Sequence, residues 1–409
     1  MKTKYGISYW LDQFPSSRTP DFPRHRGHLD IDVAIVGGGL TGCLTAYVFA
    51  AAGVKVAVFN DVRIGEGATA GSFGLLRQET DPEFQRLAAE HGLRLARHIW
   101  QSARRGSLDL AAAIRRLEIR CHLEAAPAFH VAAGGDARTL RREQEARRQA
   151  GFGQGWLRPE ALKRETALVS AGAIRIGEEA QVDPYRAALG FARAATDRGA
   201  RIFAGSRVGR VRPGRKVVDI RTDHGTVRCT RVIFTTGHAP AEIGALARHI
   251  DVRETFAVAT PAIPAKMRRE MGRVPLVLRD GGDPPHLLRW TPDGRVLFGG
   301  ADGAPSAARQ REKLLVQRTG QLMYELSLLY PGISGLPPEY GWVAPLALTA
   351  DGLPYIGPHR NFPRHLFALG FGRNGLGLSF LAARILLRHH IGDLEKGDEM
   401  WGFSRVLGD

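Results

Sequence analysis

The sequence predicts an α/β fold with an α+β part, in which one domain is built on a parallel sheet and a second on an antiparallel sheet. Short apolar runs, typical of strands buried on both faces, occur near the beginning, middle and end of the chain. Helical segments separate them, and residues 251–300 alternate as antiparallel strands do. A length of 409 residues with 44% hydrophobic residues allows two or three folding units and excludes disordered or collagen-like chains.

The first strong unit is strand, turn, helix and strand. The pattern predicts strands at Val33–Val36 and Val56–Phe59 and a helix over 40–52 between them, which is a βαβ unit. A glycine-rich stretch over 65–74 follows. Two helical segments are then expected, over 83–117 and 138–150.

A second αβ unit begins at Asp183, which we expect to cap a helix that starts at Pro184 and ends near Arg198. Strands are predicted at 200–203, 208–211, 217–222, 227–229 and 232–235, with a hairpin turn at His224-Gly225. A long helix is predicted over 307–329. The last unit is a strand at 366–369, a glycine turn through Gly370, Gly372, Gly375 and Gly377, and a helix to about His390.

The basic residues do not form an evident nucleic-acid-binding module. Lys and Arg number 57 against 41 Asp and Glu, a formal charge of +16, but arginines such as Arg94 and Arg142 fall on amphipathic stretches, where a solvated helix face explains them. A nucleic-acid partner is therefore not favoured. The three cysteines lie far apart without CxxC spacing, so the sequence predicts neither a metal site nor a disulfide framework, and buried thiols in a cytoplasmic protein are expected.

The membrane is also not expected to be a partner. The first 26 residues contain no apolar run of signal-peptide length. Residues 33–54 carry no charge and have the length of a membrane-spanning helix. Glycines in the middle of this segment suit a strand, a tight turn and a second element better than one long helix.

Gly37-Gly38-Gly39-Leu40-Thr41-Gly42 matches GxGxxG directly after a strand and at the start of a helix. In that setting Gly37 makes the turn, Gly39 lets the backbone approach a pyrophosphate, and Gly42 permits close packing of helix on strand. The phosphates would lie against the free N–H groups of the helix N-terminus, next to Leu40 and Thr41. We therefore expect a Rossmann-like domain that binds a dinucleotide.

The acidic residue that normally follows about twenty positions later, and binds the adenosine ribose, is replaced. Asn60 occupies the expected position, and Asp61 is one residue late. Asn60 can still hydrogen-bond to ribose, but without the charge that makes a carboxylate a stronger acceptor. This replacement puts the affinity for the cofactor in doubt. Without a negative charge here, discrimination against a 2′-phosphate is also weaker, so this position alone does not eliminate a nicotinamide cofactor.

Four separated signatures together resemble the D-amino-acid-oxidase-like family of FAD-dependent oxidoreductases, which includes glycine and sarcosine oxidases. They are DVAIVGGGLTG at 32–42, GATAGSFGLL at 67–76, IFTTG at 233–237, and TADGLPYIG at 349–357 followed by ALGFGRNGLG at 368–377. The resemblance implies non-covalently bound FAD. It also implies a discontinuous FAD-binding domain at 1–90, 181–250 and 341–409, with a substrate-binding domain at 91–180 and 251–340.

The resemblance implies further FAD contacts around the flavin ring and the adenosine. The loop beside the ring would contribute Gly67, Ala68, Thr69, Ser72, Gly74 and Leu75. The adenosine side would use Val208, Thr236 and Gly237, and the late glycine turn would contribute Gly372, Arg373, Asn374, Gly375 and Leu376. The helix N-terminus after that turn would stabilise a reduced, anionic flavin. Arg373 would add a full charge there or else face solvent.

No catalytic motif can be expected, because hydride transfer from the carbon beside nitrogen mainly requires orientation, a neutral amine and exclusion of water. His286 and Arg289 are candidates on the strand pair over the flavin, and Arg77 follows the flavin loop. Arg289 suits a substrate carboxylate, unless it pairs with an acid such as Asp280. His286 and Arg77 could equally have structural roles.

One departure bears on the substrate. Glycine and D-amino-acid oxidases resemble each other in an Arg-Pro before the DG-P-IG signature, where the arginine holds the substrate carboxylate; this chain has Ala344-Pro345. Trp342 could instead line an apolar or cation-binding pocket.

The expected function is oxidation of a C–N bond in a small amine or amino acid, with oxygen or another carrier as electron acceptor. Two alternatives stay open: a flavin-dependent enzyme or accessory protein acting on modified RNA, and a degenerate member that binds FAD weakly and has a structural role.

Overall fold

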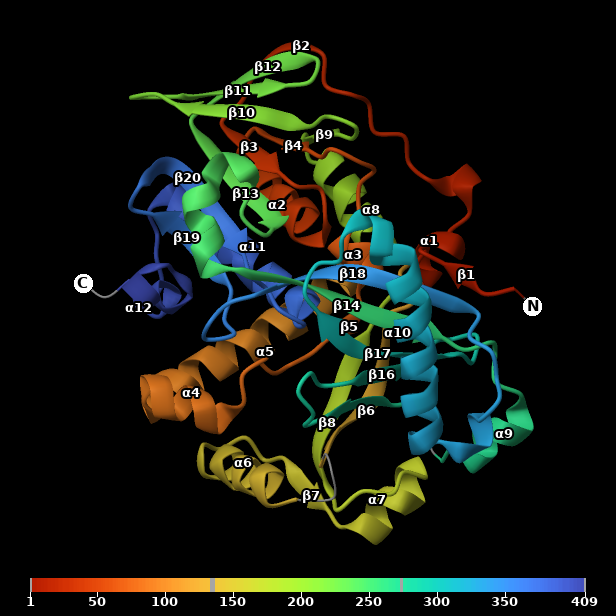
Figure 1. Cartoon of the computed structure of the whole chain (residues 1–409). Helices are drawn as coiled ribbons and strands as arrows, with labels where there is room; N and C mark the ends of the chain where they lie inside the picture. The colour runs from red at the N-terminus through yellow and green to blue at the C-terminus, as the bar shows by residue number, and fades with distance from the viewer. Residues whose placement is uncertain (1, 133–136, 273–274, 408–409) are drawn as a thin grey trace.

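A six-stranded sheet collects strands from the beginning, middle and end of the chain (Figure 1). The computed structural model describes residues 2–132, 137–272 and 275–407. In spatial order, the strands of this sheet are β19 (Tyr355–His359), β20 (Phe362–Leu369), β13 (Arg231–Gly237), β3 (Val33–Val36), β4 (Val56–Phe59) and β9 (Arg201–Phe203). All neighbours pair in parallel except β19 and β20. The parallel sheet predicted from separated apolar runs is confirmed.

Helices α2 (Leu40–Ala51), α8 (Pro184–Thr196) and α11 (Gly375–Ile391) pack together against one face of this sheet, and α5 (Leu93–Arg116) packs on α11. The Asp183 side chain accepts a hydrogen bond from the Arg186 N–H at 2.9 Å, and Pro184 occupies the first turn of α8. The predicted cap of this helix is confirmed.

A four-stranded sheet covers the opposite face. In order it contains β10 (Val208–Pro213), β11 (Val218–Thr222), β12 (Gly225–Cys229) and β2 (Gly27–Asp30). Leu29, Ile220 and Val227 bury their side chains against Phe59 and Phe234 of the six-stranded sheet. The predicted β11–β12 hairpin is confirmed.

The ten-stranded sheet lies beside these layers in Figure 1. Its strands are β1 (Lys4–Tyr5), β18 (Tyr340–Leu348), β14 (Asp251–Ala259), β17 (Val296–Gly303), β16 (Leu287–Trp290), β15 (Val277–Asp280), β6 (Glu124–Val131), β8 (Ala173–Gln181) and β5 (Leu75–Leu76), with β7 (Gly155–Leu157) paired to β8. Pairing from β14 through β16 is antiparallel, as the alternation over 251–300 predicts, whereas β15 pairs in parallel with β6. The long helix α10 (Ala308–Leu329) packs on this sheet.

The remaining elements are short. They are α1 (Tyr9–Asp12), α3 (Ala68–Gly71), α4 (Phe84–His91), α6 (Arg138–Gln149), α7 (Pro159–Thr166), α9 (Ala265–Glu270), α12 (Ser404–Leu407) and the 3₁₀ turns Ser16–Arg18, Ala241–His249, Pro331–Ile333 and Asp398–Trp401. Across the described ranges, no helix combines the length and apolar character that crossing a membrane requires. The uncharged segment over 33–54 forms a strand, a turn and a helix.

The predicted glycine turn near the C-terminus ends earlier than expected. Asn374 is the N-cap of α11, so Gly375 and Gly377 lie in the first turn of the helix. A Cβ at Gly377 would lie 2.7 Å from the Arg77 carbonyl oxygen, which means that this glycine serves close packing rather than a turn.

The division into two domains stays a proposal. Strand β5 lies within the segment 1–90 assigned to the FAD-binding domain, and β18 lies almost entirely within the segment 341–409. Both strands nevertheless pair in the ten-stranded sheet.

Candidate active site

The glycines between β3 and α2 leave no room for side chains. Gly37 has φ +109°, and a Cβ on it would lie 2.8 Å from the Thr235 carbonyl oxygen. A Cβ on Gly42 would lie 1.9 Å from the Gly37 carbonyl oxygen. Gly39 is the N-cap of α2 and provides no side-chain cap. The N-terminus of α2 therefore presents bare backbone to whatever lies in front of it.

A cavity of about 590 Å³ begins at this turn and extends to the ten-stranded sheet. We call its part beside the α2 turn the nucleotide end, which is lined by 36–41, 59–62, 207–208, 235–238 and Pro240. The sheet end is lined by Val252, Thr255, Pro285, Leu287, Gly299, Gly300 and 344–347. Between them lie the loop residues 66–69 and 71–75, and residues 371–373, Gly375, Leu376 and Ser379. An elongated ligand can therefore contact the helix terminus and the large sheet at once.

Most of the residues expected to hold the cofactor line this cavity. They are Gly37, Gly39, Leu40, Thr41, Asn60, Asp61, Gly67, Ala68, Thr69, Ser72, Gly74, Leu75, Val208, Thr236, Gly237, Gly372, Arg373, Gly375 and Leu376. Gly42 and Asn374 are not among the lining residues. Both residues contact other parts of the protein instead. Gly42, in the first turn of α2, packs against the Gly37 carbonyl, and the Asn374 amide donates a hydrogen bond to the Glu79 carbonyl oxygen.

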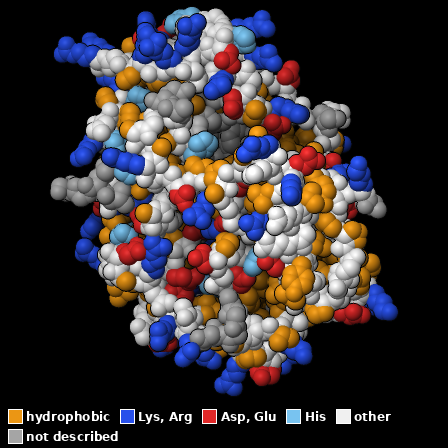
Figure 2. Space-filling view, in the orientation of Figure 1, with side chains coloured by type: hydrophobic (Ala, Val, Ile, Leu, Met, Phe, Trp, Pro, Cys, Tyr) orange, Lys and Arg blue, Asp and Glu red, His pale blue; other side chains and the backbone are white. Residues whose placement is uncertain are grey.

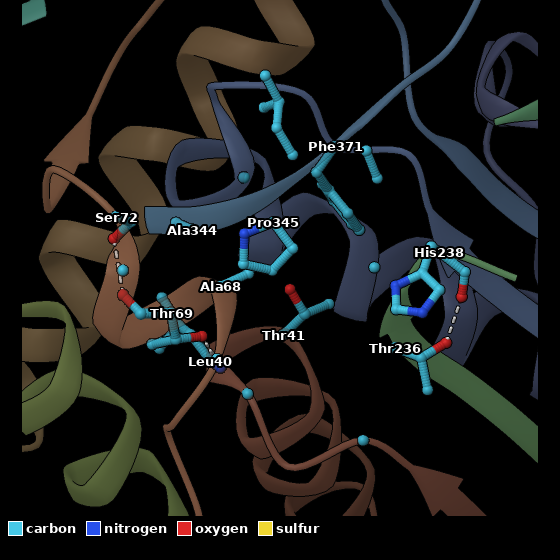
Figure 3. Close-up of a pocket in the computed structure, with 18 of the residues that line it drawn as sticks. Leu40, Thr41, Ala68, Thr69, Ser72, Thr236, His238, Ala344, Pro345 and Phe371 are labelled. Carbon is cyan, nitrogen blue, oxygen red and sulfur yellow. Dashed lines mark hydrogen bonds between the residues drawn. The ribbon is translucent and has the colours of Figure 1, made fainter. Parts of the chain in front are cut away.

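Several lining residues were not anticipated from the sequence, among them Thr255, Leu287, Phe371 and His238. Figure 3 shows Phe371 and Pro345 approaching the cavity from one side and Thr41, Ala68 and Thr69 from the other. Thr255 and Leu287 belong to no cofactor-binding signature, because their strands reach the cavity only through the tertiary fold.

The side-chain amide of Asn60 forms three hydrogen bonds within the protein. Its Oδ1 accepts a hydrogen bond from the Gly38 N–H at 2.8 Å, and its Nδ2 donates to the carbonyl oxygens of Val62 and Arg63 at 3.1 and 3.0 Å. The side chain thus ties the glycine turn to the loop after β4. Its expected hydrogen bond to ribose would have to be made in addition to these three.

The loop over 67–75 is fixed by donors from outside it. The Trp10 and Trp342 indole N–H groups donate to the carbonyl oxygens of Ser72 and Gly71 at 2.8 and 2.9 Å. Within the loop, Ser72 Oγ donates to the Thr69 carbonyl oxygen, and Thr69 Oγ1 accepts from the Leu40 N–H (Figure 3). Trp342 is buried and is not among the lining residues, so the pocket-lining role suggested for it is wrong.

Arg289 contacts no carboxylate within hydrogen-bond distance among the described residues. Its Nη1 donates to three carbonyl oxygens, those of Phe73, Gly74 and Val182, at 2.8, 3.0 and 2.8 Å. The side chain is 1% exposed, and burial lowers its pKa to about 10, so it is protonated at neutral pH. Asp280, the acid expected as its alternative partner, binds His286 instead. Arg289 does not line the cavity.

His286 lies behind the cavity wall, between Pro285 and Leu287, which both line it. Its Nδ1 is 2.7 Å from Asp280 Oδ2, its Nε2 is 3.1 Å from Glu325 Oε2, and its ring stacks on Phe298. Burial lowers the pKa of His286, but the hydrogen bond and charge of Asp280, with Glu325, outweigh burial and leave the pKa above its usual 6.5.

Arg77 is also buried and outside the cavity lining. Its Nη1 donates to Asp81 Oδ1 at 2.8 Å, while Asp81 Oδ2 accepts the backbone N–H of Arg373. Burial opposes the charge of Arg77, but Asp81, Glu179 and Glu79 raise its pKa. Arg77 therefore supports the segment that leads into α11.

Arg373 lines the cavity, and its guanidinium forms an ion pair with Asp302 of β17. The alternative in which it faces solvent is wrong, because its side chain is only 17% exposed. The charge that it was expected to add beside the flavin is balanced by a carboxylate.

The family described as FAD dependent oxidoreductase (DAO) matches residues 32–388. The chain belongs to this family. The resemblance drawn from the four signatures is confirmed, and the protein is an FAD-dependent oxidoreductase.

Relatives cover nearly the full chain. The gamma-glutamylputrescine oxidoreductase of Escherichia coli is 26% identical over 406 residues, which is 97% of this chain and 91% of the relative. The probable oxidoreductase OrdL of Haemophilus influenzae is 24% identical, over 95% of this chain and 89% of its own. The solved glycine oxidase of Geobacillus kaustophilus superposes with a TM-score of 0.76 at 23% identity, covering 93% of this chain and 100% of its own. The predicted fold class is confirmed.

FAD fits the residues that are present. The bare α2 terminus admits a pyrophosphate, since side chains at Gly37 and Gly42 would collide with backbone. The cavity is long enough to contact both sheets and is lined mainly by glycine and apolar residues away from the α2 turn.

Proposed function

We propose that this protein oxidises a C–N bond of a small amine or amino acid by hydride transfer to FAD. The observation that supports this most is the continuity of the cavity. A single cavity extends from the N-terminus of α2, a helix terminus of the kind that binds phosphate, to an apolar pocket on the ten-stranded sheet. FAD, when bound, would accept the hydride that leaves the carbon bonded to nitrogen; the neutral amine would thereby become an iminium cation, which water hydrolyses to a carbonyl compound and an amine or ammonia.

In this proposal the pyrophosphate lies against Gly39, Leu40 and Thr41, and the adenosine lies beside Asn60, Asp61 and Val208. The flavin ring lies between two segments, Ser72–Leu75 and Gly372–Leu376. The N-terminus of α11 then points its partial positive charge toward the ring.

The substrate binds at the sheet end. Apolar groups such as Leu287, Leu346 and Phe371 exclude water and favour the neutral amine, the form from which a hydride can leave. The walls orient the C–H bond toward the ring, and this placement is the main catalytic contribution of the chain.

Ala344 lies in the cavity wall, and its side chain has no group that can form a hydrogen bond or an ion pair with a carboxylate. A Cβ on Gly71 would lie 2.5 Å from the Ala344 Cβ, so β18 approaches α3 closely at this point. We propose that Arg289, His286 and Arg77 are positioning residues behind the wall, since their side chains bond to protein groups.

Product analysis tests the proposed reaction. Purified holoenzyme is incubated with a panel of primary and secondary amines and amino acids, and the carbonyl compound and released amine or ammonia are quantified. We expect equimolar products from at least one member. A Thr255→Phe variant, which fills the sheet end, should keep FAD and lose turnover, whereas Val316→Phe on the exposed face of α10 should lose neither. FAD-loaded protein that forms no product from any panel member would overturn the proposal.

A further inference from the structure

The ion pair between Arg373 and Asp302 decides the charge at the sheet end of the cavity. Among the described lining residues, basic side chains belong to Arg207, His238 and Arg373. The first two lie at the nucleotide end. Arg373 is therefore the cation that a substrate carboxylate at the sheet end could reach, and its guanidinium is already paired with a carboxylate.

Asp302 is held where a competing anion cannot easily displace it. Its side chain is 3% exposed, and it projects from β17 two residues after Gly300, which lines the cavity. Its Oδ2 pairs with Arg373, and its Oδ1 is buried without a hydrogen-bond partner among the described residues. Removing Arg373 from this carboxylate would leave both oxygens buried without compensation, which is costly.

The backbone of Arg373 is anchored as well. Its N–H donates to Asp81 Oδ2, and Asp81 is fixed by Arg77. Carboxylates thus hold the residue at both its backbone and its guanidinium, so the guanidinium cannot swing to a new partner by moving the turn. A substrate carboxylate brought to Arg373 would also lie near Asp302 and be repelled by it.

We propose that Asp302 is a specificity-determining positioning residue. By neutralising Arg373, it makes the sheet end select amines that lack a carboxylate on the carbon to be oxidised, and disfavour α-amino acids. This inference rests on the proposed amine oxidation and narrows its substrate class. The observations that carry it are the Arg373–Asp302 pair, the buried and unpartnered Oδ1, and alanine at position 344.

Paired substrates test the inference on the unaltered enzyme. Each amino acid is compared with the amine that lacks its carboxylate: glycine with methylamine, sarcosine with dimethylamine, and phenylalanine with phenethylamine. We expect kcat/KM to be at least about tenfold higher for the amine in every pair that reacts. This factor corresponds to the free energy of one charge-assisted hydrogen bond, which the substrate carboxylate cannot form with the neutralised Arg373. Preference for the amino acids would overturn the inference and leave amine oxidation standing. Reaction with neither class would instead refute the proposed function.

Binding of a simple carboxylate gives a readout that needs no turnover. Benzoate is titrated into the holoenzyme, and perturbation of the visible flavin absorbance is recorded. We expect weak binding to the unaltered protein and at least about tenfold tighter binding to Asp302→Asn, in which the Arg373 charge is released. Asp302→Glu keeps the charge and should behave like the unaltered protein. Asp283→Asn, which removes an exposed acid between β15 and β16, is the matched control.

Removing both charges in Arg373→Met/Asp302→Asn keeps the test decisive if Asp302→Asn fails to fold, because neither charge is then left buried alone. If Asp302 neutralises Arg373, this double variant should change the amine-to-amino-acid ratio of kcat/KM by less than about threefold. A loss of about tenfold or more that affects the amino acids alone would show that Arg373 binds substrate carboxylates despite Asp302. That result, or equal benzoate affinity in the unaltered protein and Asp302→Asn, would overturn the inference.

Discussion

At the scale of single residues, Asn60 shows how one amide can replace a carboxylate in a nucleotide site. It accepts a hydrogen bond from Gly38 and donates two to the carbonyls of Val62 and Arg63. A carboxylate could accept the first bond but could not make the other two. Asparagine at this position therefore serves the loop, and the absence of a charge need not mean a degenerate site.

We predict that Asn60→Asp weakens FAD binding rather than restoring it. The carboxylate loses two donated hydrogen bonds, at about 1 kcal/mol each, and faces two carbonyl oxygens. The FAD dissociation constant should rise about tenfold in a fluorescence titration. Asn361→Asp, on an exposed turn, is the control and should leave it unchanged. Unchanged or tighter FAD binding by Asn60→Asp would contradict this role.

Arg289 has the corresponding role on the flavin side. Its guanidinium donates to three carbonyl oxygens of the chain, and Arg289→Met would remove this donor from all three, although the Gly74 carbonyl would keep the hydrogen bond from the Val182 N–H. We predict a loss of about 3 kcal/mol or more in the free energy of unfolding, measured by urea denaturation. KM should change by the same factor for amines and amino acids. Arg253→Met, an exposed arginine on β14, should change stability by less than about 0.5 kcal/mol. A selective rise in KM for amino acids would instead identify Arg289 as a substrate ligand.

The sequence alone could predict the role of the glycines at this site but not the roles of the arginines and the histidine. The glycine spacing identified the cofactor-binding turn because steric limits at Gly37 and Gly42 are local. Arginine and histidine gave no comparable signal. Arg289 is suited to a carboxylate or to carbonyls alike, and only the folded neighbours of its guanidinium decide between them.

At the scale of elements, an ion pair connects the end of β15 to the residue before β16, just behind the proposed substrate pocket. His286, which precedes β16, bonds to Asp280 at the end of β15 and to Glu325 of α10. The pair joins two strands and a helix. Its contribution to stability depends on the proton that His286 holds.

The sign of this dependence follows from the raised pKa of His286. The folded protein holds the proton more tightly than the unfolded chain, so the stabilisation is complete below the unfolded value of 6.5 and disappears as the pH rises through the folded pKa. We predict that the excess stability of the unaltered protein over His286→Gln shrinks from about pH 6 to about pH 8 in thermal denaturation. Asp280→Asn should remove most of this trend. A difference that grows with pH would contradict it.

Periodicity predicted the long and regular elements because burial imposes it on every residue of a strand or helix. It did not predict the beginning of α11, where Gly375 and Gly377 look like turn residues but lie in the helix, and where close packing leaves no room for a side chain at Gly377. Nor did it reveal that two distant tryptophans, Trp10 and Trp342, hold the loop beside the cavity.

At the scale of the whole molecule, the cavity is bounded by the six-stranded and ten-stranded sheets, so its ligand connects them. Figure 2 shows basic side chains distributed over the visible face, with acidic ones among them across its lower half. The sequence could indicate the two kinds of sheet, but the residues at the sheet end come from separate strands and could not be assembled from linear spacing.

We predict that removing FAD lowers the thermal stability of the whole protein in one step. A ligand at a hundred times its dissociation constant stabilises the native state by about 2.7 kcal/mol. The melting temperature of the apoprotein should rise with added FAD. FMN, which lacks the adenosine half, should have a smaller effect at equal concentration. Equal stabilisation by both would contradict simultaneous contact with the two ends.

Reduction of FAD by an amine at the sheet end of this cavity is measured by the visible absorbance of the holoenzyme after anaerobic addition of an amine. We predict that the oxidised flavin spectrum is lost and returns when an electron acceptor is admitted. A spectrum that persists with every amine and amino acid, although dithionite bleaches it, would show that no such reduction takes place.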